Sequence, residues 1–401
     1  MVLLAHPGTQ YSHQLARQLV RHDALYQFWT GFALATNGLV GQVINKYAPP
    51  EWRRKIANRV VRGVPARSLR TMPVIEWKAL KRLRDGEPAQ KVFHERNRAF
   101  QEMIPAASVQ KASAVIGFDT SSWLLAERAA HYGKPYFLDQ SISHPLVNQR
   151  IMEGVARRFP DWHAEIEARL PEVFACERRE YGLASKIIAA SSFSKNSLVS
   201  EGIAPDRIIV NPYGVDLEQF HPPDTPRTRE PVRFLFVGLI SARKGVPLLL
   251  EAWRRMNLKN AELWMVGPVQ ERERALIPEL PGLKFLGKYP HRELPELLRK
   301  CDVLVFPSYC EGFALVLLEA LASAMPIITT EATAGPDLIE DGREGRLIPA
   351  GDLDALCAAM REFTNDPDKL ESMGRAARQC AEKFSWDAYG ERWQQILGDN
   401  A

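Results

Sequence analysis

The chain has 401 residues, more than one ordinary hydrophobic core holds, so two domains are expected. Its hydrophobic and charged fractions, 46% and 25%, are typical of a globular protein, and a net charge of +4 indicates no particular partner. Five scattered cysteines without a CxxC pair exclude a disulfide framework and a cysteine zinc site, and they favour a reducing compartment. Because no signal peptide or membrane-spanning run is found, we expect a cytoplasmic protein or a peripheral one on the inner face of the membrane.

The N-terminus has the pattern that opens a doubly wound domain. Residues 2–5 form a short apolar run typical of a buried strand, residues 6–12 a loop, and residues 14–21 a helix. Gly8 in this loop would let the backbone approach a ligand closely, or it could serve an ordinary tight turn. The loop contains no GxGxxG, so the nicotinamide dinucleotide fingerprint is absent from it.

Residues 43–85 form a basic stretch in which tryptophan and aliphatic residues are interleaved. Such a stretch suits an anionic membrane surface or an anionic, lipid-linked acceptor. It could equally be a solvated helical face whose long side chains cover the core. Nucleic acid is the weakest option, because no recognition module accompanies the charge.

Two strand–loop pairs then place polar residues at one edge of the predicted sheet. Residues 114–117 and 135–138 are apolar runs typical of strands, each followed by a loop. Because parallel strands end at a common edge, both loops should open on the same cleft. The polar residues of these loops that we single out are Asp119, Asp139 and His144.

The middle of the chain predicts the passage from one domain to the next. Residues 186–190 should form a strand, with Ser191 capping the helix that follows it. Gly214, in the turn after another short strand, is expected to take a positive φ angle. Residues 222–226 contain three prolines and are interpreted as the interdomain linker.

A second strand–loop–helix series begins near residue 232. Residues 234–237 should form a strand, and Gly238 opens the loop after it. Arg243 and Lys244 stand directly before the next helix, where they could hold an anion or form surface salt bridges. A later strand at residues 283–287 leads into a loop that contains Tyr289.

The most informative stretch spans residues 302–324. An apolar strand should end before Glu311, and a helix of good helix formers over residues 314–324 should contain Glu319. Their spacing separates the two carboxylates by about 12 Å along a helix axis. Free N–H groups at a helix start attract phosphate, and a carboxylate accepts hydrogen bonds from vicinal hydroxyls. A nucleoside diphosphate sugar would fit this spacing, although two ordinary helix charges would look the same.

These residues resemble the donor-binding signature of glycosyltransferase family 4, whose members are retaining enzymes of GT-B architecture. The family pattern is a Glu, seven residues and a second Glu, followed by Pro-Ile, as in Glu311, Glu319 and Pro326 here. The resemblance extends from about residue 185 to the C-terminus and is loose before that. Two departures are Ala324, where the family usually has Gly, and Asp337, where it commonly has Glu.

The resemblance implies an α/β fold with two Rossmann-like, doubly wound parallel-sheet domains and an interdomain cleft. Residues 1–215 would bind the acceptor and residues 216–380 the nucleotide-sugar donor. Residues 381–401 would form a helix that crosses back to the N-terminal domain.

The resemblance also implies roles for single residues. Lys244 matches the family's diphosphate-binding lysine, and Arg243 could replace an arginine that the family carries where this chain has Leu239. Glu311 would hold the donor sugar and Glu319 the ribose, while the cations stabilise the leaving diphosphate. Further donor-side residues are Gly312, Phe313, Ala314, Leu315, Gly238, Tyr289 and Gly8, and the acceptor-side candidates are Asp119, Asp139 and His144.

The implied activity is transfer of a hexose-type sugar to a glycan or lipid-linked hydroxyl acceptor in envelope or extracellular glycan synthesis. No Asp-x-Asp follows a strand, so we expect no metal requirement and no cofactor. Nucleic acid is not expected as a partner. Three alternatives stay open: a donor-rearranging epimerase of the GT-B type, a non-catalytic binding protein, and a phosphorylase, for which no pyridoxal lysine motif is visible.

Overall fold

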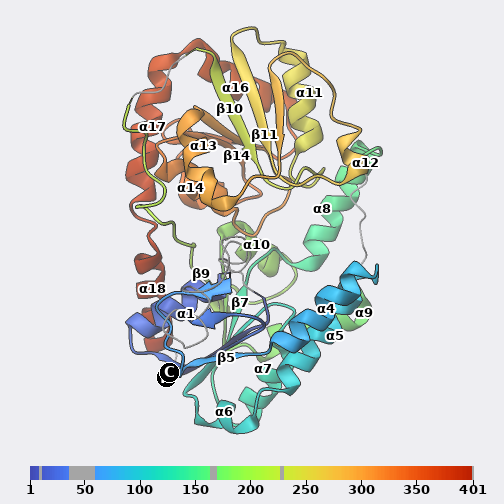
Figure 1. Ribbon diagram of the computed structural model, residues 1–401, viewed down its shortest axis with the longest axis vertical. Helices are drawn as coiled ribbons and strands as arrows, with labels where there is room; N and C mark the ends of the chain where they lie inside the picture. Colours follow the sequence, from blue (N-terminus) through green and yellow to red (C-terminus); the bar gives the residue numbers. More distant parts are fainter. Residues whose placement is uncertain (9–10, 36–58, 163–168, 226–229, 400–401) are drawn as a thin grey trace, which may run out of the picture.

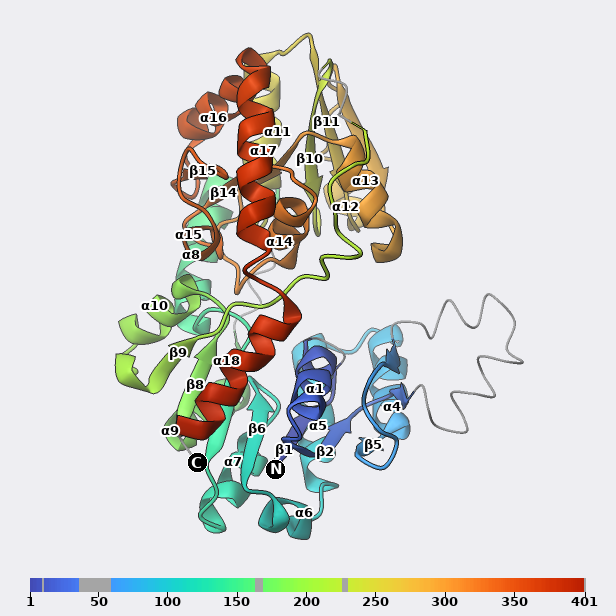
Figure 2. The same ribbon diagram turned by 90° about the vertical axis from the view of Figure 1, so that its left-hand side faces the viewer.

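The computed structural model describes residues 1–8, 11–35, 59–162, 169–225 and 230–399. It consists of two α/β halves, each a parallel sheet covered by helices (Figure 1). The predicted fold class, two doubly wound parallel-sheet domains, is therefore confirmed. The first and last described residues both lie in the N-terminal half (Figure 2).

The N-terminal sheet has seven parallel strands in the order β5-β2-β1-β6-β7-β8-β9. The strands are β1 (Val2–His6), β2 (Leu25–Thr30), β5 (Leu69–Thr71), β6 (Ala114–Phe118), β7 (Tyr136–Gln140), β8 (Lys186–Ala189) and β9 (Ile208–Val210). The helices of this half are α1 (Ser12–Arg21), α4 (Pro73–Arg84), α5 (Ala89–Glu102), α6 (Ala106–Lys111), α7 (Trp123–His131), α8 (Pro145–Arg158), α9 (Pro171–Leu183) and α10 (Ser192–Ser200). A separate pair joins β3 (Leu34–Ala35) to β4 (Val60–Val61).

The C-terminal sheet has six parallel strands in the order β12-β11-β10-β13-β14-β15. The strands are β10 (Val232–Val237), β11 (Ala261–Val266), β12 (Leu283–Gly287), β13 (Val303–Phe306), β14 (Ile327–Thr330) and β15 (Gly345–Ile348). The helices are α11 (Val246–Met256), α12 (Glu271–Arg274), α13 (Leu294–Lys300), α14 (Leu315–Ala322), α15 (Gly335–Leu338), α16 (Leu353–Asn365), α17 (Pro367–Ala381) and α18 (Trp386–Asp399).

Both sheets reverse their strand order at one point, and these points fix where ligands can bind. The reversal lies between β1 and β6 in the N-terminal sheet and between β10 and β13 in the C-terminal sheet. At such a point the two connecting helices leave toward opposite faces, so a crevice opens outside the carboxyl ends of the strands. The loops after β10 and β13 are those that carry Lys244 and Glu311.

The last two helices connect the halves. Helix α17 packs on α14 in the C-terminal half, whereas α18 packs on α1 in the N-terminal half (Figure 2). Arg392 of α18 donates to Asn211 Oδ1 at 2.6 Å, which ties the helix to the segment after β9. The division at residues 215 and 380, with one half for each substrate, stays a prediction.

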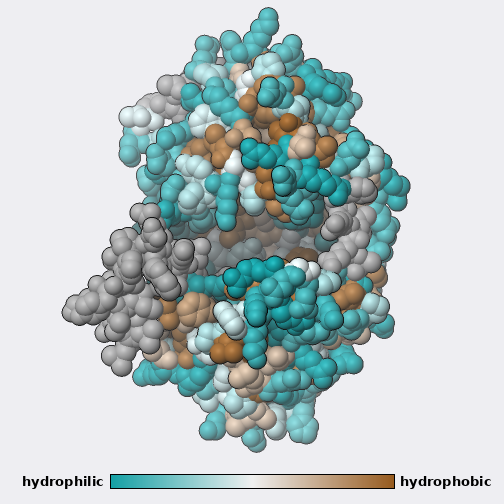
Figure 3. Space-filling model, turned by 45° about the vertical axis from the view of Figure 1, so that its right-hand side comes forward, coloured by the Kyte–Doolittle hydropathy of each residue, from teal (hydrophilic) through white to brown (hydrophobic). Residues whose placement is uncertain are grey.

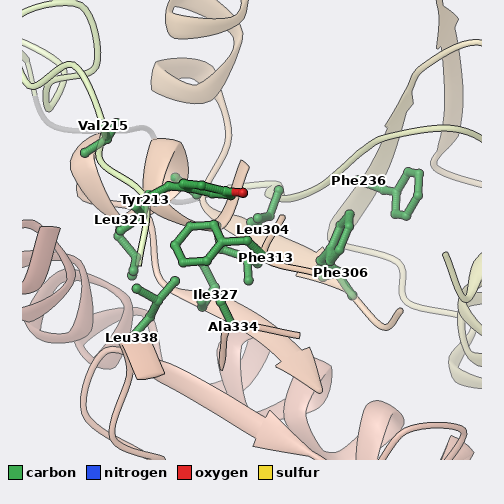
Figure 4. Close-up of a cluster of buried hydrophobic side chains, with 14 of the residues drawn as sticks. Tyr213, Val215, Phe236, Leu304, Phe306, Phe313, Leu321, Ile327, Ala334 and Leu338 are labelled. Atoms are coloured by element: carbon green, nitrogen blue, oxygen red, sulfur yellow. The ribbon is translucent and has the colours of Figure 1, made fainter. Parts of the chain in front are cut away.

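One aromatic contact joins the two halves through the core. The ring of Tyr213, which follows β9, meets the ring of Phe313 edge-on with centroids 5.1 Å apart (Figure 4). Phe313 belongs to the loop between β13 and α14 and is buried. This loop is therefore packed against the N-terminal half as well as against its own sheet.

Three local predictions need correction. Gly214 does not have a positive φ angle; its hydrogen is needed because a Cβ would overlap the backbone of Ser385 and Trp386. Asp139 was expected in a loop but lies within strand β7, one residue before its end. The helix expected over residues 314–324 spans only Leu315–Ala322, because Ala314 and Ala324 take left-handed conformations with φ 72° and 51°.

Part of the basic stretch, including Arg53 and Arg54, lies outside the described residues. Its described remainder contains β4, β5 and the whole of α4. Within the described residues, no helix combines the length and apolarity needed to cross a membrane.

Candidate active site

A cavity of about 580 Å³ lies between the carboxyl edges of the two sheets. Figure 3 shows it as a hollow across the middle of the molecule. Its N-terminal wall includes Tyr11, Ser141, Ser143 and Asn148, and its C-terminal wall includes Gly238, Arg243, Lys244, His291, Glu311, Gly312, Phe313, Ala314, Leu315 and Glu319. Most residues predicted for the donor side are thus brought together, whereas their individual roles stay predictions.

The carboxylate of Glu311, after β13, collects three donors on one oxygen. Arg243 Nη1 lies 2.7 Å and Lys244 Nζ 2.5 Å from Oε1. Ser308 Oγ donates to the same oxygen at 3.0 Å. Among the residues that the structure describes, none donates to Oε2. One side of this carboxylate is therefore fixed, and the other is left for a ligand in the cavity.

Lys244 reaches Glu311 because the loop after β10 passes close to the end of β13. Gly245 makes this possible, with φ 74° and no room for a Cβ beside the carbonyl of Pro307. Burial lowers the pKa of Lys244, which Glu311 partly opposes. The ammonium also lies 4.9 Å from the centroid of the Phe306 ring. Since burial disfavours its charge, an additional anion in the cavity would be favourable for this lysine.

Helix α14 begins at the cavity wall. Ala314 is its N-cap residue, and the side chains of Leu315 and Val316 line the cavity. The first N–H groups of a helix have no partner within the helix, so an anion placed here would meet free donors and the positive end of the helix dipole. The left-handed backbone of Ala314 is a strained conformation of the kind found at ligand sites.

Glu319, one turn further along α14, already has a partner that the sequence did not suggest. His291 Nε2 lies 2.7 Å from Glu319 Oε1. This hydrogen bond is the main reason why the pKa of His291 is raised above its ordinary value. His291 and Glu319 also line a second, adjoining cavity of about 270 Å³. A ribose at Glu319 would have to share the carboxylate with this imidazole.

The glycine after Glu311 is held by the N-terminal half. Ser191 Oγ and Ser194 Oγ donate to the carbonyl of Gly312 at 2.6 and 3.2 Å. A Cβ on Gly312 would overlap the carbonyl oxygen of Ser141. Because these serines stand at the start of α10 in the N-terminal half, the position of the Glu311 loop depends on both halves.

The three acceptor-side candidates do not line this cavity. Asp139 is 2% exposed, and burial raises its pKa well above the usual range. Asp119 accepts from Ser141 N and Oγ at 3.0 and 2.7 Å. His144 is buried and caps α8, with Nδ1 accepting from Leu146 N. Their contacts are those of structural groups, and their acceptor role stays a prediction.

Two donor-side candidates also lie away from the described cavities. Gly8 stands against the ring of His6, and Tyr289 packs partly buried against the core of the C-terminal half. Tyr11 and His291, a few residues further along the same two loops, line the cavity instead. No motif marks either residue, so only the tertiary structure could identify them.

Within the described residues, no group of three His, Cys, Asp or Glu side chains is placed to hold a metal ion. The expected independence from metal stays a prediction.

Comparison with known proteins adds to this geometry. Residues 218–380 match the family model described as Glycosyl transferases group 1. WcaL of Salmonella typhimurium, assigned to colanic acid biosynthesis as a glycosyltransferase, is 30% identical over 311 residues, which cover 70% of this chain and 75% of WcaL.

Solved structures agree over the whole length of the chain. Sucrose-phosphate synthase from Thermosynechococcus elongatus superposes with a TM-score of 0.69 at 18% identity, covering 99% of this chain and 98% of that one. HepE from Anabaena, solved in complex with UDP, gives a TM-score of 0.65 at 14% identity, with 99% of both chains covered. At these identities the likeness shows a common fold.

Proposed function

The chain belongs to the group 1 glycosyl transferases, also called family 4, and from this premise we propose that it is a retaining enzyme of envelope or extracellular glycan synthesis. As a member it is a glycosyltransferase that uses a nucleotide-sugar donor. The proposed reaction moves a hexose from a nucleoside diphosphate to a hydroxyl group of a glycan or lipid-linked acceptor.

The observation that carries this proposal is the convergence of two cations, a helix start and two carboxylates on one cavity. Arg243 and Lys244 would bind the diphosphate together with the N–H groups at the start of α14. Glu319 would accept hydrogen bonds from the ribose, and Oε2 of Glu311 from the donor sugar. HepE, with the same fold, was solved with UDP, which supports a nucleoside diphosphate as the ligand.

The proposed chemistry exchanges one bond at the anomeric carbon for another. The bond to the diphosphate oxygen breaks, and the acceptor hydroxyl attacks from the same face of the sugar. The leaving phosphate takes the acceptor's proton, so no separate base is needed. Negative charge grows on the diphosphate as it leaves, and Lys244 and Arg243 would stabilise that charge.

We place the acceptor at a membrane because of one helix face. Helix α4 exposes Trp77, Val74 and Leu80, whose exposed fractions are 58%, 61% and 43%. Lys78 and Lys81 are interleaved with them and have no carboxylate within ion-pair distance among the described residues. A cationic helix face with an exposed tryptophan fits an anionic lipid surface. WcaL's assignment to colanic acid biosynthesis agrees with an envelope or extracellular glycan as the product.

The testing experiment is a screen of UDP-, GDP-, ADP- and CMP-sugars for thermal stabilisation and nucleotide release, with EDTA present. One nucleotide sugar should stabilise the protein and slowly release its nucleoside diphosphate. In Lys244→Gln, affinity for that nucleotide should fall about tenfold, the loss of one charged hydrogen bond.

The matched control is Lys259→Gln, which removes an exposed lysine at the opposite end of the C-terminal sheet. It should bind the donor like the wild type. Release of a rearranged sugar without any acceptor would favour the epimerase alternative, and binding without turnover under all acceptors would favour a binding protein. If no nucleotide sugar stabilises the protein, the donor-site proposal is wrong.

A further inference from the structure

The N-terminal sheet has a reversal point of its own, which the donor site does not use. It lies between β1 and β6, and His6 at the end of β1 meets Ser121 after β6, with Nδ1 and Oγ 3.4 Å apart. From the described N-terminal half, the donor cavity is lined by Tyr11, which follows β1, and by Ser141, Ile142, Ser143 and Asn148, which follow β7. Strands are about 4.8 Å apart, so the reversal point is roughly 5–10 Å from that wall.

Two arginines meet at this reversal point around a single carboxylate. Arg59 Nη2 lies 3.5 Å from Glu76 Oε1, and Arg96 Nη1 lies 3.4 Å from Glu76 Oε2. Glu76 stands at the strand ends, since a Cβ on Gly31 after β2 would be 3.2 Å from Glu76 Oε2. Each contact with Glu76 is single and long, so neither guanidinium makes with it the paired hydrogen bonds that arginine forms with a well-matched carboxylate. Arg96 also donates from Nε and Nη2 to Asn97 Oδ1 at 3.0 and 2.8 Å, an uncharged partner that leaves its positive charge uncompensated.

The cluster carries an excess of positive charge in a partly buried place. The side chains of Arg96 and Glu76 are 13% and 9% exposed, while that of Arg59 is 25% exposed. Burial lowers the pKa of Arg96, which shows that the surroundings disfavour its charge. One carboxylate cannot neutralise two cations, and an uncompensated buried charge is costly. An anion entering beside Arg59 would remove this cost.

Two buried histidines lie beside the arginines, and one of them strengthens the case. Burial lowers the pKa of His6 to about 3 and that of His13 to about 4, so both are uncharged at neutral pH. Among the described residues, neither His6 Nε2 nor His13 Nε2 has a hydrogen-bond partner. Ser121 Oγ donates to the carbonyl of Phe118, so His6 Nδ1–H must donate to Ser121, and Nε2 of His6 can only accept. His13 Nε2 is therefore the nitrogen that can donate to an anion, and a buried polar group without a partner indicates that something else completes the site.

We propose that Arg59 and Arg96 form a subsite for an anionic group, a phosphate or a carboxylate, that the acceptor carries. The anion would lie at the reversal point of the N-terminal sheet, with the reacting hydroxyl toward the donor cavity. This inference rests on the proposed function, because a sugar acceptor is what would bring the anion to this edge. A phosphate would point to a lipid-phosphate or phosphorylated sugar acceptor, and a carboxylate to an acidic glycan.

The test is a calorimetric titration of the full chain with inorganic phosphate and, separately, with glucuronate at constant ionic strength. The donor site is filled with UDP, so that Lys244 and Arg243 are occupied. Arg59→Gln should weaken binding of the preferred anion at least tenfold. Arg62→Gln, which removes an exposed arginine three positions away, should leave it within twofold. Whichever anion binds more tightly identifies the source.

Equal affinities in Arg59→Gln and Arg62→Gln, or no binding of either anion to the wild type, would overturn the proposal. The variant Glu76→Gln distinguishes a binding site from a merely structural ion pair. If Glu76 competes with the anion for the arginines, its neutralisation should tighten anion binding severalfold. If Glu76 only holds the arginines in place, the same change should weaken anion binding. If UDP itself does not bind, the donor proposal fails, and the same titrations in Lys244→Gln still test the anion subsite.

Discussion

Glu319 is the residue on which the nucleotide assignment depends most directly. Its carboxylate lines the cavity where α14 begins, about one helical turn beyond the proposed diphosphate position. Glu319→Gln keeps the shape and the His291 contact but removes the charge. We expect the dissociation constant for the donor to rise about tenfold, as for the loss of a charged hydrogen bond. Calorimetry with the donor found in the screen measures this.

The control for that variant is Glu391→Gln, on the exposed side of α18, which should bind the donor normally. An unchanged affinity in Glu319→Gln would contradict the ribose assignment, even if catalysis were lost.

His291 predicts a pH dependence of stability in the absence of donor. Its pKa is raised from the usual 6.5, mainly by the hydrogen bond to Glu319. A pKa that is raised in the folded state stabilises the protein fully at pH values below the pKa of the unfolded state. This stabilisation is lost as the pH rises through the pKa of the folded state. The melting temperature of the wild type should therefore exceed that of His291→Gln most at about pH 5.5 and least at about pH 8.5. A constant difference across this range would show that the imidazolium–carboxylate pair contributes nothing.

Ala324 is one of the two departures from the family pattern, and replacing it should stabilise the protein. Its φ angle is 51°, in the left-handed region that costs an L-residue about 1–2 kcal/mol, and the family usually has glycine here. Ala324→Gly removes that cost but adds about 0.4–1 kcal/mol of unfolded-state entropy. A net gain of roughly 0.5–1 kcal/mol in the free energy of unfolding should appear in urea titrations.

Ala322→Gly is the matched control, because Ala322 is the last residue of α14 and does not have a positive φ angle. There the same substitution should destabilise by about 1 kcal/mol. A destabilised Ala324→Gly would mean that the methyl group's packing outweighs the backbone strain.

At the scale of single elements, α4 makes the most direct prediction. If its exposed face docks on anionic lipid, replacing Lys78 and Lys81 by glutamate should weaken association with anionic liposomes roughly thirtyfold or more, at about 1 kcal/mol per lysine removed. Trp77→Ser with Leu80→Ser should weaken it as well, with less dependence on salt. Liposome co-sedimentation at low salt measures both.

Leu183→Ser with Leu286→Ser is the control, since these two residues are also exposed but lie on other elements. Donor binding should be normal in every one of these variants. If the wild type and the α4 variants sediment equally with liposomes, the exposed face of α4 does not bind lipid. It would then be an ordinary solvated surface, the alternative that the sequence had left open.

The sequence was sufficient where the chemistry is local. Apolar runs separated by helical segments predicted the parallel sheets, because a strand buried on both faces must be apolar throughout. Glu311 and Glu319 are close in the chain, so a strand, a loop and a helix already fix their relation. Lys244 could be added because the resemblance to family 4 places a diphosphate-binding lysine directly before this glycine.

The sequence was insufficient where contacts join distant segments. His291, in the short turn after β12, reaches Glu319 of α14 although 28 positions separate them in the chain. Gly214 needs its small size for α18, which returns to it from the end of the chain. Asp139 was chosen as a polar loop residue, yet it is buried in β7 facing Tyr389. Polarity alone does not distinguish a cavity wall from a buried hydrogen-bond network.

For the whole molecule, the decisive question is what holds the halves closed around the cavity. Asp337 of α15 accepts hydrogen bonds from the backbone and side chain of Ser192 of α10, across the two halves. It is the second departure from the family, which commonly has Glu. Ser191 and Ser194 hold Gly312 from the same helix start, so this end of α10 fixes the loop of Glu311.

Removing this link should therefore impair turnover more than donor binding. In Asp337→Ala we expect turnover to fall about tenfold, from loss of a charged hydrogen-bond pair, while UDP affinity changes less than about twofold. X-ray scattering should show a larger radius of gyration with donor bound. Asp337→Glu, which keeps the carboxylate, should recover most of the turnover. Equal losses of turnover and UDP affinity in Asp337→Ala would instead mean that Asp337 supports the C-terminal half itself rather than its closure on the other.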